Sequence, residues 1–349
     1  MSGPSTPVPE ISIVIATYNR RSTLARTLSC LAKQDFDPAR FEVIVIDDAS
    51  PDDTPQLVAE LAPQLPYALR FLRNDTNSGP GLAQNRGIRA ARAPLLMITT
   101  DDVFADPSMV RAHLGFHRAR PEREQVALGR VVQSPELCGS ALMRKWDPFR
   151  FWLLEDGQEL PFYMFWACNV SCKREFIEAV GMFREHGGRA GAVAFEDLEV
   201  GYRLSQAGMT LSYLAAATGD HYHEYTIDGG IERWRLRGLN YAEFRTFVPD
   251  PVLDVYFHVL NAQTFSSYLA VLRGRNPFRG REASLAWHLC REAVRRMLLN
   301  RVTVRWIWRP LLDAAERSRH IERLTTRQVY RAFFYYHFLR GVREARLRF

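Results

Sequence analysis

Short apolar runs alternate with helical segments through the first hundred residues, and this alternation constrains the fold more than any other feature of the chain. The runs span residues 11–15, 41–46, 69–72 and 95–98. Their β-branched and other apolar side chains are typical of buried strands. About 20 to 30 residues connect one run to the next, which is enough for a crossover helix. The spacing therefore predicts a mostly parallel α/β sheet with helices on both faces.

The connecting segments carry helix signals. Ser22 and Thr54 are candidate N-caps of the first two helices, because a side-chain hydroxyl at that position accepts a backbone N–H. A third helix is expected at about residues 82–92, after a loop at 77–81. The glycines of that loop allow the backbone to approach a ligand closely, although one glycine-rich turn is weak evidence.

Polar side chains follow three of the four predicted strands. They are Thr17, Asp47 and the pair Asp101 and Asp102. Ligands bind beyond the carboxyl ends of parallel strands, so we expect these side chains to face one crevice. Two adjacent carboxylates repel each other and lose hydration unless a cation lies beside them, and oxygen ligands favour Mg²⁺ or Mn²⁺. From these residues alone, a metal site and a solvated turn explain the acidic pair equally well.

The loop after the first strand excludes two common classes of nucleotide-binding site. It reads A-T-Y-N-R at residues 16–20, which matches neither G-x-G-x-x-G nor G-x-x-x-x-G-K-[ST]. The sheet is therefore neither an NAD-type nor a P-loop binder.

Two later segments contain further candidate groups. Glu196 and Asp197 precede a helical pattern, where they either complement the helix dipole or supply a general base. His221 and His223 follow the apolar residues 211–217, and both point the same way if that segment is extended. These histidines either complete an oxygen-rich metal site or are exposed loop residues.

Taken in order, these segments resemble the inverting family 2 of nucleotide-sugar glycosyltransferases, whose members have the GT-A fold. The resemblance covers about residues 10–235, and its individual motifs are weak while their shared order is specific. The matches are residues 13–20 (I-V-I-A-T-Y-N-R), 45–54 to the family's V-D-D-G-S-x-D-x-T, 77–87 to N-x-G-x-x-x-A-R-N-x-G, 100–102 to D-x-D, 169–171 and 181–183 to N-x-S and G-x-F, and 196–204 to E-D-x-x-x-x-x-R-L.

Two residues depart from the family pattern. Thr100 replaces the first aspartate of the usual triplet, which leaves two carboxylates for the metal. Gln84 replaces the usual arginine, which removes a cation near the nucleotide crevice. We expect neither change to prevent the chemistry.

The resemblance implies a set of donor contacts. Thr17 and Asp47 would contact the nucleoside base, with Asp47 accepting the ring N–H, and Asp101 would lie near the ribose or the metal. The other donor contacts implied by the matching motifs are Tyr18, Asn19, Arg20, Asp48, Gly79 and Asn85.

The resemblance also implies a catalytic set. Asp197 would be the catalytic base, and Glu196 would help to orient the acceptor. Asp102 would bind a divalent Mg²⁺ or Mn²⁺ directly, beside Asp101. His221, or alternatively His223, would be an additional ligand of the metal or the diphosphate.

The implied fold is a Rossmann-like mixed, mostly parallel sheet with helices on both faces and a C-terminal helical extension. We expect a nucleotide-sugar-binding half at residues 8–105, an acceptor-binding and catalytic half at 106–235, and an Arg- and aromatic-rich extension at 236–349. The implied activity is inverting, metal-assisted transfer of a sugar from a nucleoside-diphosphate sugar to a hydroxyl of a glycan, lipid-linked or small-molecule acceptor.

Two other function classes compete with this interpretation. A sugar-nucleotide-forming nucleotidyltransferase would also use such a sheet, but it usually carries a G-x-G-T-R-x-x-P loop after the first strand. A nucleic-acid- or membrane-binding module would use the basic C-terminal region.

Positive charge is concentrated in the last hundred residues. The net charge is +7 for the chain, yet residues 251–349 contain 19 arginines, no lysine and 7 acidic residues. The acidic front half argues against a nucleic-acid partner. Arginines alternate with Trp306, Ile307 and Trp308, as in a helix that lies on anionic lipid. The alternatives are a helical cap on the catalytic core and a dimer interface built on residues 333–338.

The sequence predicts a cytoplasmic protein, with peripheral contact at the inner face of the membrane as an alternative. The N-terminus lacks the pattern of a signal peptide, and no window contains 18 uninterrupted apolar residues. The cysteines are odd in number and form no C-x-x-C pair, so buried thiols are favoured over a metal or redox site. They are Cys30, Cys138, Cys168, Cys172 and Cys290.

Overall fold

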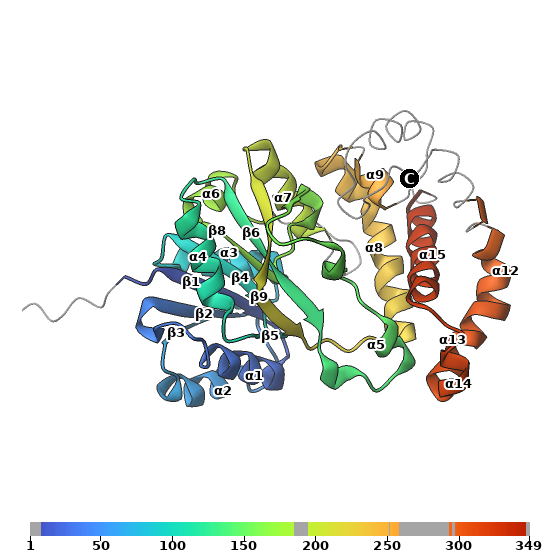
Figure 1. Ribbon diagram of the computed structural model, residues 1–349, viewed down its shortest axis with the longest axis horizontal. Helices are drawn as coiled ribbons and strands as arrows, with labels where there is room; N and C mark the ends of the chain where they lie inside the picture. Colours follow the sequence, from blue (N-terminus) through green and yellow to red (C-terminus); the bar gives the residue numbers. More distant parts are fainter. Residues whose placement is uncertain (1–7, 185–194, 251, 258–292, 295–296, 347–349) are drawn as a thin grey trace, which may run out of the picture. The chain divides into compact units, whose positions relative to one another are not determined.

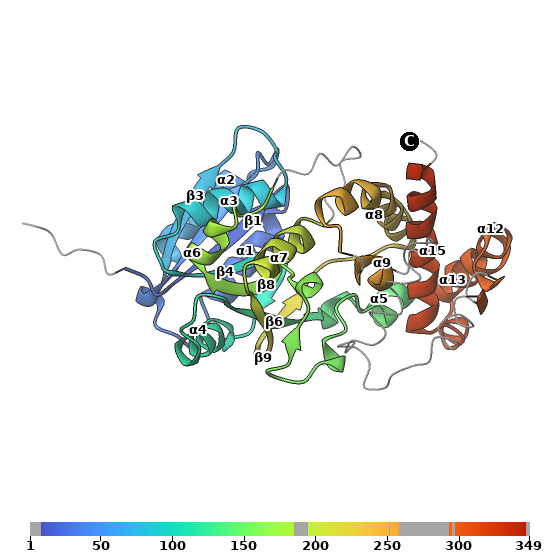
Figure 2. The same cartoon turned by 90° about the horizontal axis from the view of Figure 1, so that it is seen from above.

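The computed structural model describes residues 8–184, 195–250, 252–257, 293–294 and 297–346 (Figures 1 and 2). The chain divides into two compact units. The sheet unit comprises Met1–Ser134, Phe151–His186 and Phe195–His223, and the helical unit comprises Pro135–Arg150, Gly187–Ala194 and Glu224–Phe349.

The sheet unit is built on one mixed sheet, in which nine strands are described. The strand order is β3-β2-β1-β4-β8-β6-β9-β5, and β7 also pairs with β9. The first four strands of that order are mutually parallel, whereas β8 is antiparallel to both β4 and β6. The strands are β1 Ile11–Thr17, β2 Phe41–Asp47, β3 Ala68–Arg73, β4 Leu95–Thr100, β5 Val103–Ala105, β6 Gln125–Gln133, β7 Glu159–Leu160, β8 Asn169–Lys173 and β9 Thr210–His221.

The four strands predicted from apolar runs are confirmed, each extended at one or both ends by one or more residues. The side chains of β1 and β2 are almost all buried, because helices cover both faces of these strands. The predicted sheet, with helices on both faces, is therefore present. The antiparallel strands β5, β7 and β8 make the sheet mixed.

Helices pack on the sheet at close range. A Cβ at Gly87 of α3 would lie 2.5 Å from the side chains of both Val14 and Ile46, so only glycine lets α3 approach β1 and β2 this closely. The helices of the sheet unit are α1 Arg21–Leu31, α2 Thr54–Leu61, α3 Pro80–Ala90, α4 Met109–Ala119, α6 Arg174–Ala179 and α7 Glu196–Gln206, with short 3-10 turns at Pro38–Arg40, Ala62–Gln64, Phe151–Leu153 and Phe162–Met164.

Both predicted N-caps are wrong by one or two positions. Helix α1 begins at Arg21, so Ser22 lies inside its first turn, and the N-cap Arg20 makes no side-chain capping bond. Thr54 is the first residue of α2, after the N-cap Asp53, and its hydroxyl donates to Asp52 Oδ1.

The helical unit has its own aromatic core. Helices α8 and α15 lie side by side in both views, and a Cβ at Gly238 of α8 would lie only 2.0 Å from the carbonyl oxygen of Phe338. The core also includes Trp146 and Tyr330. The elements are α5 Ala141–Lys145, α8 Ile227–Phe247, α9 Val252–Tyr256, α12 Arg301–Thr303, a π-helical turn Val304–Trp308, α13 Arg309–Arg317, α14 Arg319–Glu322 and α15 Arg327–Arg346, with a 3-10 turn at Pro135–Leu137.

The helical region begins earlier than the predicted residue 236. Thr226 caps α8 by accepting the N–H of Gly229, so α8 starts at Ile227. The functional division of the sheet unit at residue 105 stays a prediction.

Three of the aromatic residues that we considered for a dimer interface are core residues of this unit. Phe333, Phe334 and Phe338 are each no more than 1% exposed within one chain, so they belong to its core, and a homodimer through the C-terminal helices stays a prediction. Trp306 and Ile307, by contrast, are 68% and 55% exposed, so contact with lipid stays a prediction. Within the part of the chain that the structure describes, no helix is both long and apolar enough to span a bilayer.

The cysteine prediction holds in part. Cys172 is a buried free thiol of β8, and Cys168 lies just before that strand. Cys138 is exposed, contrary to the expectation of burial, because it lies in the loop between a 3-10 turn and α5. Cys290 lies outside the described residues.

Candidate active site

The carboxyl ends of β1 and β4 bring three predicted site residues into contact. Ala16 of β1 is in register with Thr100 of β4, so the residues that follow each strand are neighbours. The hydroxyl of Thr17 donates to Asp101 Oδ2 at 2.6 Å, and the hydroxyl of Thr100 donates to Asp102 Oδ1 at 2.7 Å. Thr100, which replaces a family aspartate, therefore orients the carboxylate of Asp102.

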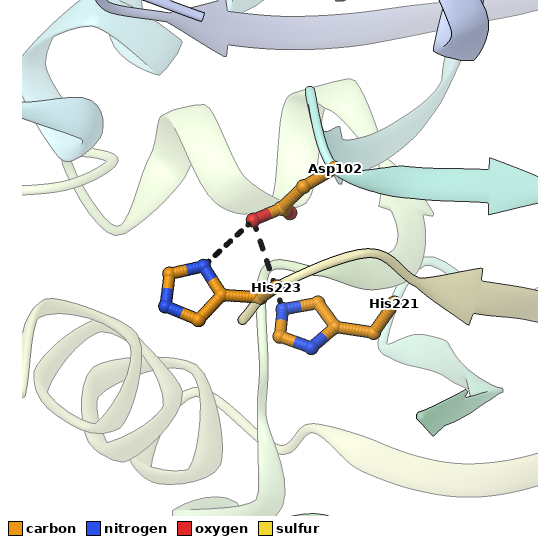
Figure 3. A group of neighbouring side chains, drawn as sticks. All are labelled: Asp102, His221 and His223. Carbon is orange, nitrogen blue, oxygen red and sulfur yellow. Dashed lines mark ion pairs between the residues drawn. The ribbon is translucent and has the colours of Figure 1, made fainter. Parts of the chain in front are cut away.

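Backbone pairing places the two histidines beside Asp102 (Figure 3). Val103 of β5 pairs with His221 of β9, and the N–H of Tyr222 donates to the carbonyl of Asp102 at 2.7 Å. His223 Nδ1 lies 3.3 Å and His221 Nε2 lies 3.8 Å from the same oxygen, Asp102 Oδ2. The two rings stack with centroids 5.4 Å apart, so the histidines point the same way, as predicted for an extended segment.

Arg20 supplies a positive charge beside the two carboxylates of this cluster. Its Nη1 lies 3.1 Å from Asp101 Oδ1 and 2.5 Å from Asp102 Oδ2, and its Nη2 lies 3.2 Å from His223 Nδ1. Burial and then the charge of Asp102 raise the pKa of Asp101 to about 6, although Arg20 offsets part of this shift. Burial also opposes ionisation of Asp102, but contacts with the two histidines and Arg20 outweigh it and hold that pKa below its usual range.

Asp47 presents an acceptor at the end of β2. Its Oδ1 accepts the N–H of Ser50 at 2.9 Å. Its Oδ2 is buried and accepts no hydrogen bond from the described residues, although Arg73 Nη1 forms an ion pair with it at 3.0 Å. A buried acceptor without a hydrogen bond fits the predicted contact with a base N–H.

Asp48 organises the loop before α3. Its carboxylate accepts the N–H of Ser78 and, at 2.8 Å, that of Gly79, and it also accepts the amide of Asn74 at 2.7 Å. Gly79 has a φ of 86°, a conformation that favours glycine. Direct contacts of Asp48 and Gly79 with a donor stay predictions.

The other residues of the first loop have different surroundings. Tyr18 is 47% exposed, and Asn19 has a φ of 53° and donates its N–H to Ser50 Oγ at 2.9 Å. This bond ties the loop after β1 to the loop after β2. The contacts of Tyr18 and Asn19 with a donor stay predictions.

Both the nitrogen and the oxygen of the Asn85 side-chain amide form hydrogen bonds. Its Nδ2 donates to the carbonyl of Phe183 at 2.7 Å, and its Oδ1 accepts the N–H of Phe183 at 2.9 Å. Because these bonds fasten α3 to the G-x-F segment, we assign Asn85 a positioning contribution, and its predicted donor contact stays untested.

Arg203 is a positioning residue whose contribution the sequence reasoning missed. It forms two 2.6 Å bonds with Glu199 of the same helix, and it also donates to the carbonyls of Val180 and Met182. Arginine at this point of the E-D-x-x-x-x-x-R-L motif therefore joins α7 to the G-x-F turn. The spacing of Glu199 and Arg203 by four residues was the available signal.

The predicted base lies at the start of α7. Helix α7 begins at Glu196, and Asp197 Oδ2 accepts the N–H of Ala167 at 3.2 Å. Burial raises the pKa of the Cys168 thiol, and the charges of Asp197 and Asp102 add to that shift. Both carboxylates therefore lie near Cys168, which brings the base candidate and the Asp102 cluster to one region of the sheet unit.

Glu196 lies close to the first turn of α3. A Cβ at Gly81 would lie 3.0 Å from Glu196 Oε2, so a small residue at position 81 leaves space for this carboxylate. Its predicted part in orienting an acceptor is not tested by these contacts.

Comparison with known proteins identifies relatives by sequence. The model of the family described as glycosyl transferase family 2 matches residues 12–177. Validoxylamine A glucosyltransferase of Streptomyces hygroscopicus subsp. limoneus is 30% identical over 295 residues, which cover 76% of this chain and 63% of the relative. The enzyme of the same name from subsp. jinggangensis is also 30% identical, with 76% of this chain and 68% of the relative covered.

Solved structures identify similar folds. The mannosyltransferase PcManGT from Pyrobaculum calidifontis, in complex with GDP-Man and Mn²⁺, has a TM-score of 0.56 and 20% identity, covering 89% of this chain and 87% of the other. TarS 1-349 of S. aureus in complex with UDP has a TM-score of 0.53 and 19% identity, covering 97% of this chain and 92% of that fragment. At these identities the similarity shows the fold, which is that of the GT-A glycosyltransferases.

Proposed function

Because this chain belongs to glycosyl transferase family 2 and is a glycosyltransferase, we propose that it catalyses an inverting, metal-assisted displacement on a nucleoside-diphosphate sugar. The observation that carries the proposal is the convergence of Asp102, His221 and His223 at the carboxyl edge of the sheet. Family membership favours this function over a nucleotidyltransferase.

The side chains around Asp102 fit a divalent cation. Asp102 Oδ2, His221 Nε2 and His223 Nδ1 would hold it, since the three ligand atoms of this cluster lie within 4.8 Å of one another. Imidazole nitrogens suit Mn²⁺ better than Mg²⁺, which prefers oxygen and keeps its water ligands. One structural neighbour is a complex with Mn²⁺, which supports the same choice. When bound, the metal would neutralise the charge that develops on the departing diphosphate.

Asp197 would accept the proton of the acceptor hydroxyl. As that oxygen forms its bond to the anomeric carbon, the bond between this carbon and the diphosphate oxygen breaks on the opposite face. Glu196 would help to hold the acceptor. One base and one metal suffice for a single displacement, so we expect the configuration of the anomeric carbon to invert.

The donor is proposed to lie along the ends of β1, β2 and β4. Asp47 Oδ2 would accept an N–H of the base, and Thr17 would contact the same ring. Two structural neighbours are complexes with GDP-Man and UDP, so both nucleotides belong in a test.

A donor panel tests the proposal. UDP-, GDP- and dTDP-sugars are incubated with the protein, with and without validoxylamine A, for which two relatives are named. We expect release of nucleoside diphosphate from one donor class, loss of release with EDTA, and recovery with Mn²⁺ more than with Mg²⁺. Release that is unchanged by EDTA and by Asp102→Asn would contradict the metal-assisted mechanism.

A further inference from the structure

We propose that Arg20 occupies the cation position of the Asp102 site and is exchanged for the metal when donor and metal bind. This inference rests on the proposed function, since it concerns the same metal site. Its new content is that the guanidinium and the metal compete for the same two ligand atoms.

The contacts of Arg20 coincide with those proposed for the metal. The guanidinium bonds to Asp102 Oδ2 through Nη1 and to His223 Nδ1 through Nη2. Both of these atoms are among the three proposed above as ligands of the divalent ion, in the cluster of Asp102, His221 and His223. The Arg20 side chain is 35% exposed, whereas that of Asp102 is 6% exposed, so the guanidinium reaches the cluster from its more open side.

The chemistry of His223 makes the competition strict. A guanidinium has only N–H donors, so it can bond to His223 Nδ1 only in the tautomer that leaves this nitrogen unprotonated, and a metal at Nδ1 requires the same tautomer. Both would use the single lone pair of that nitrogen. Arg20 and a metal therefore cannot share this nitrogen, and binding of the metal there requires Arg20 to leave.

Charge balance explains why an arginine lies beside these two carboxylates. Asp101 and Asp102 are 4% and 5% exposed, and adjacent buried carboxylates need a cation nearby. Arg20 supplies one positive charge and contacts both carboxylates. A divalent ion would supply two charges and repel the guanidinium, so the exchange keeps the carboxylates compensated at every stage.

A released Arg20 needs a new anionic partner. It lies on the loop that follows β1, at the carboxyl edge where the donor is proposed to bind. A planar guanidinium forms paired hydrogen bonds with phosphate oxygens, so the diphosphate of the donor is such a partner. Metal binding should consequently be weak without nucleotide and tighter with it, and this coupling must be reciprocal.

Mn²⁺ affinity measures the exchange directly. Free Mn²⁺ is titrated by its EPR signal against wild type, Arg20→Gln and Arg20→Lys, first alone and then with the nucleoside diphosphate of the donor class. Without nucleotide, we expect Arg20→Gln to bind Mn²⁺ about tenfold more tightly than wild type, within the roughly 5–150-fold range of such couplings. Arg20→Lys should lie between them, because one ammonium cannot bridge the carboxylates and the imidazole together.

The neighbouring Arg21 provides a matched control. Its side chain is exposed, so Arg21→Gln removes the same charge one residue away without touching the cluster. We expect wild-type Mn²⁺ affinity from this variant. Thermal unfolding with and without Mn²⁺ checks folding, and Mn²⁺ should raise the Tm of Arg20→Gln more than that of wild type.

The outcomes separate the exchange from the metal site itself. If wild type binds Mn²⁺ and Arg20→Gln binds it equally or more weakly, the exchange is overturned while the proposed metal site stands. If neither protein binds Mn²⁺ with or without nucleotide, the proposed metal site fails and the exchange fails with it.

Discussion

Asp197 is the residue on which the proposed chemistry depends most directly. It lies in the first turn of α7, near the same cysteine, Cys168, as Asp102. We predict that Asp197→Asn lowers kcat by a factor of roughly 10² to 10⁴, because the amide keeps the shape of the side chain but accepts no proton. The KM for the donor should change little, since Asp197 is not a proposed donor contact.

The neighbouring Glu196 serves as the comparison for this prediction. Glu196→Gln should raise the KM for the acceptor and lower kcat by less than Asp197→Asn does. Steady-state kinetics with the donor identified in the panel measure both variants. Near-wild-type kcat from Asp197→Asn would show that the base lies elsewhere.

Helix α4 is held to the sheet by a buried polar network. The Ser171 hydroxyl contacts His113 Nδ1 at 2.7 Å and His117 Nε2 at 2.9 Å, and His113 Nε2 lies 2.9 Å from Asn169 Oδ1. Asn169 also donates to the carbonyl of Ala217 at 2.8 Å. Asn169 and Ser171 of the N-x-S motif in β8 therefore hold α4 and β9 together. Since β9 ends at His221, this network stabilises the strand that leads into the candidate metal site.

This network predicts a pH-dependent stability. Burial lowers the pKa of His113 to about 4 from an ordinary value of 6.5. As the pH falls below 6.5, the unfolded chain takes up this proton before the folded protein does, so stability is full above pH 6.5 and is lost towards pH 4. Between pH 7.5 and 5, the stability advantage of wild type over His113→Gln should shrink by about 2 kcal/mol.

Urea unfolding of both proteins at the two pH values measures this change. His320 is exposed, so His320→Gln is a suitable control and should show the same difference from wild type at both pH values. A stability gap between wild type and His113→Gln that stays constant from pH 7.5 to 5 would refute the linkage.

At the scale of the whole molecule, the parallel half of the sheet could be predicted and the antiparallel half could not. Strands β1, β2 and β4 are mostly apolar and almost fully buried, and burial on both faces produces that pattern, whereas β3 at the sheet edge is only partly buried. Strands β6 and β8 carry polar residues among their apolar ones. Arg130 of β6 is exposed, whereas Asn169 and Ser171 of β8 are buried and form hydrogen bonds with His113 and His117. No local pattern reveals such partners.

The same limit applies to the candidate site. The adjacent carboxylates and the spacing of the histidines by two residues were visible in the sequence. The carboxylates and the histidines are brought together by the pairing of Val103 with His221, which is a contact between segments far apart in the chain. The contact of Arg20 with both groups depends on that pairing, so the sequence placed Arg20 among the donor contacts and not at the metal site.

The anomeric configuration of the first product tests the central claim most directly. The reaction of wild type with its donor and Mn²⁺ is followed by ¹H NMR, using the accepted acceptor, or water if no acceptor is found. A single displacement with Asp197 as base predicts a product whose anomeric configuration is opposite to that of the donor sugar. Formation of a product with the configuration of the donor, before any mutarotation, would contradict this account.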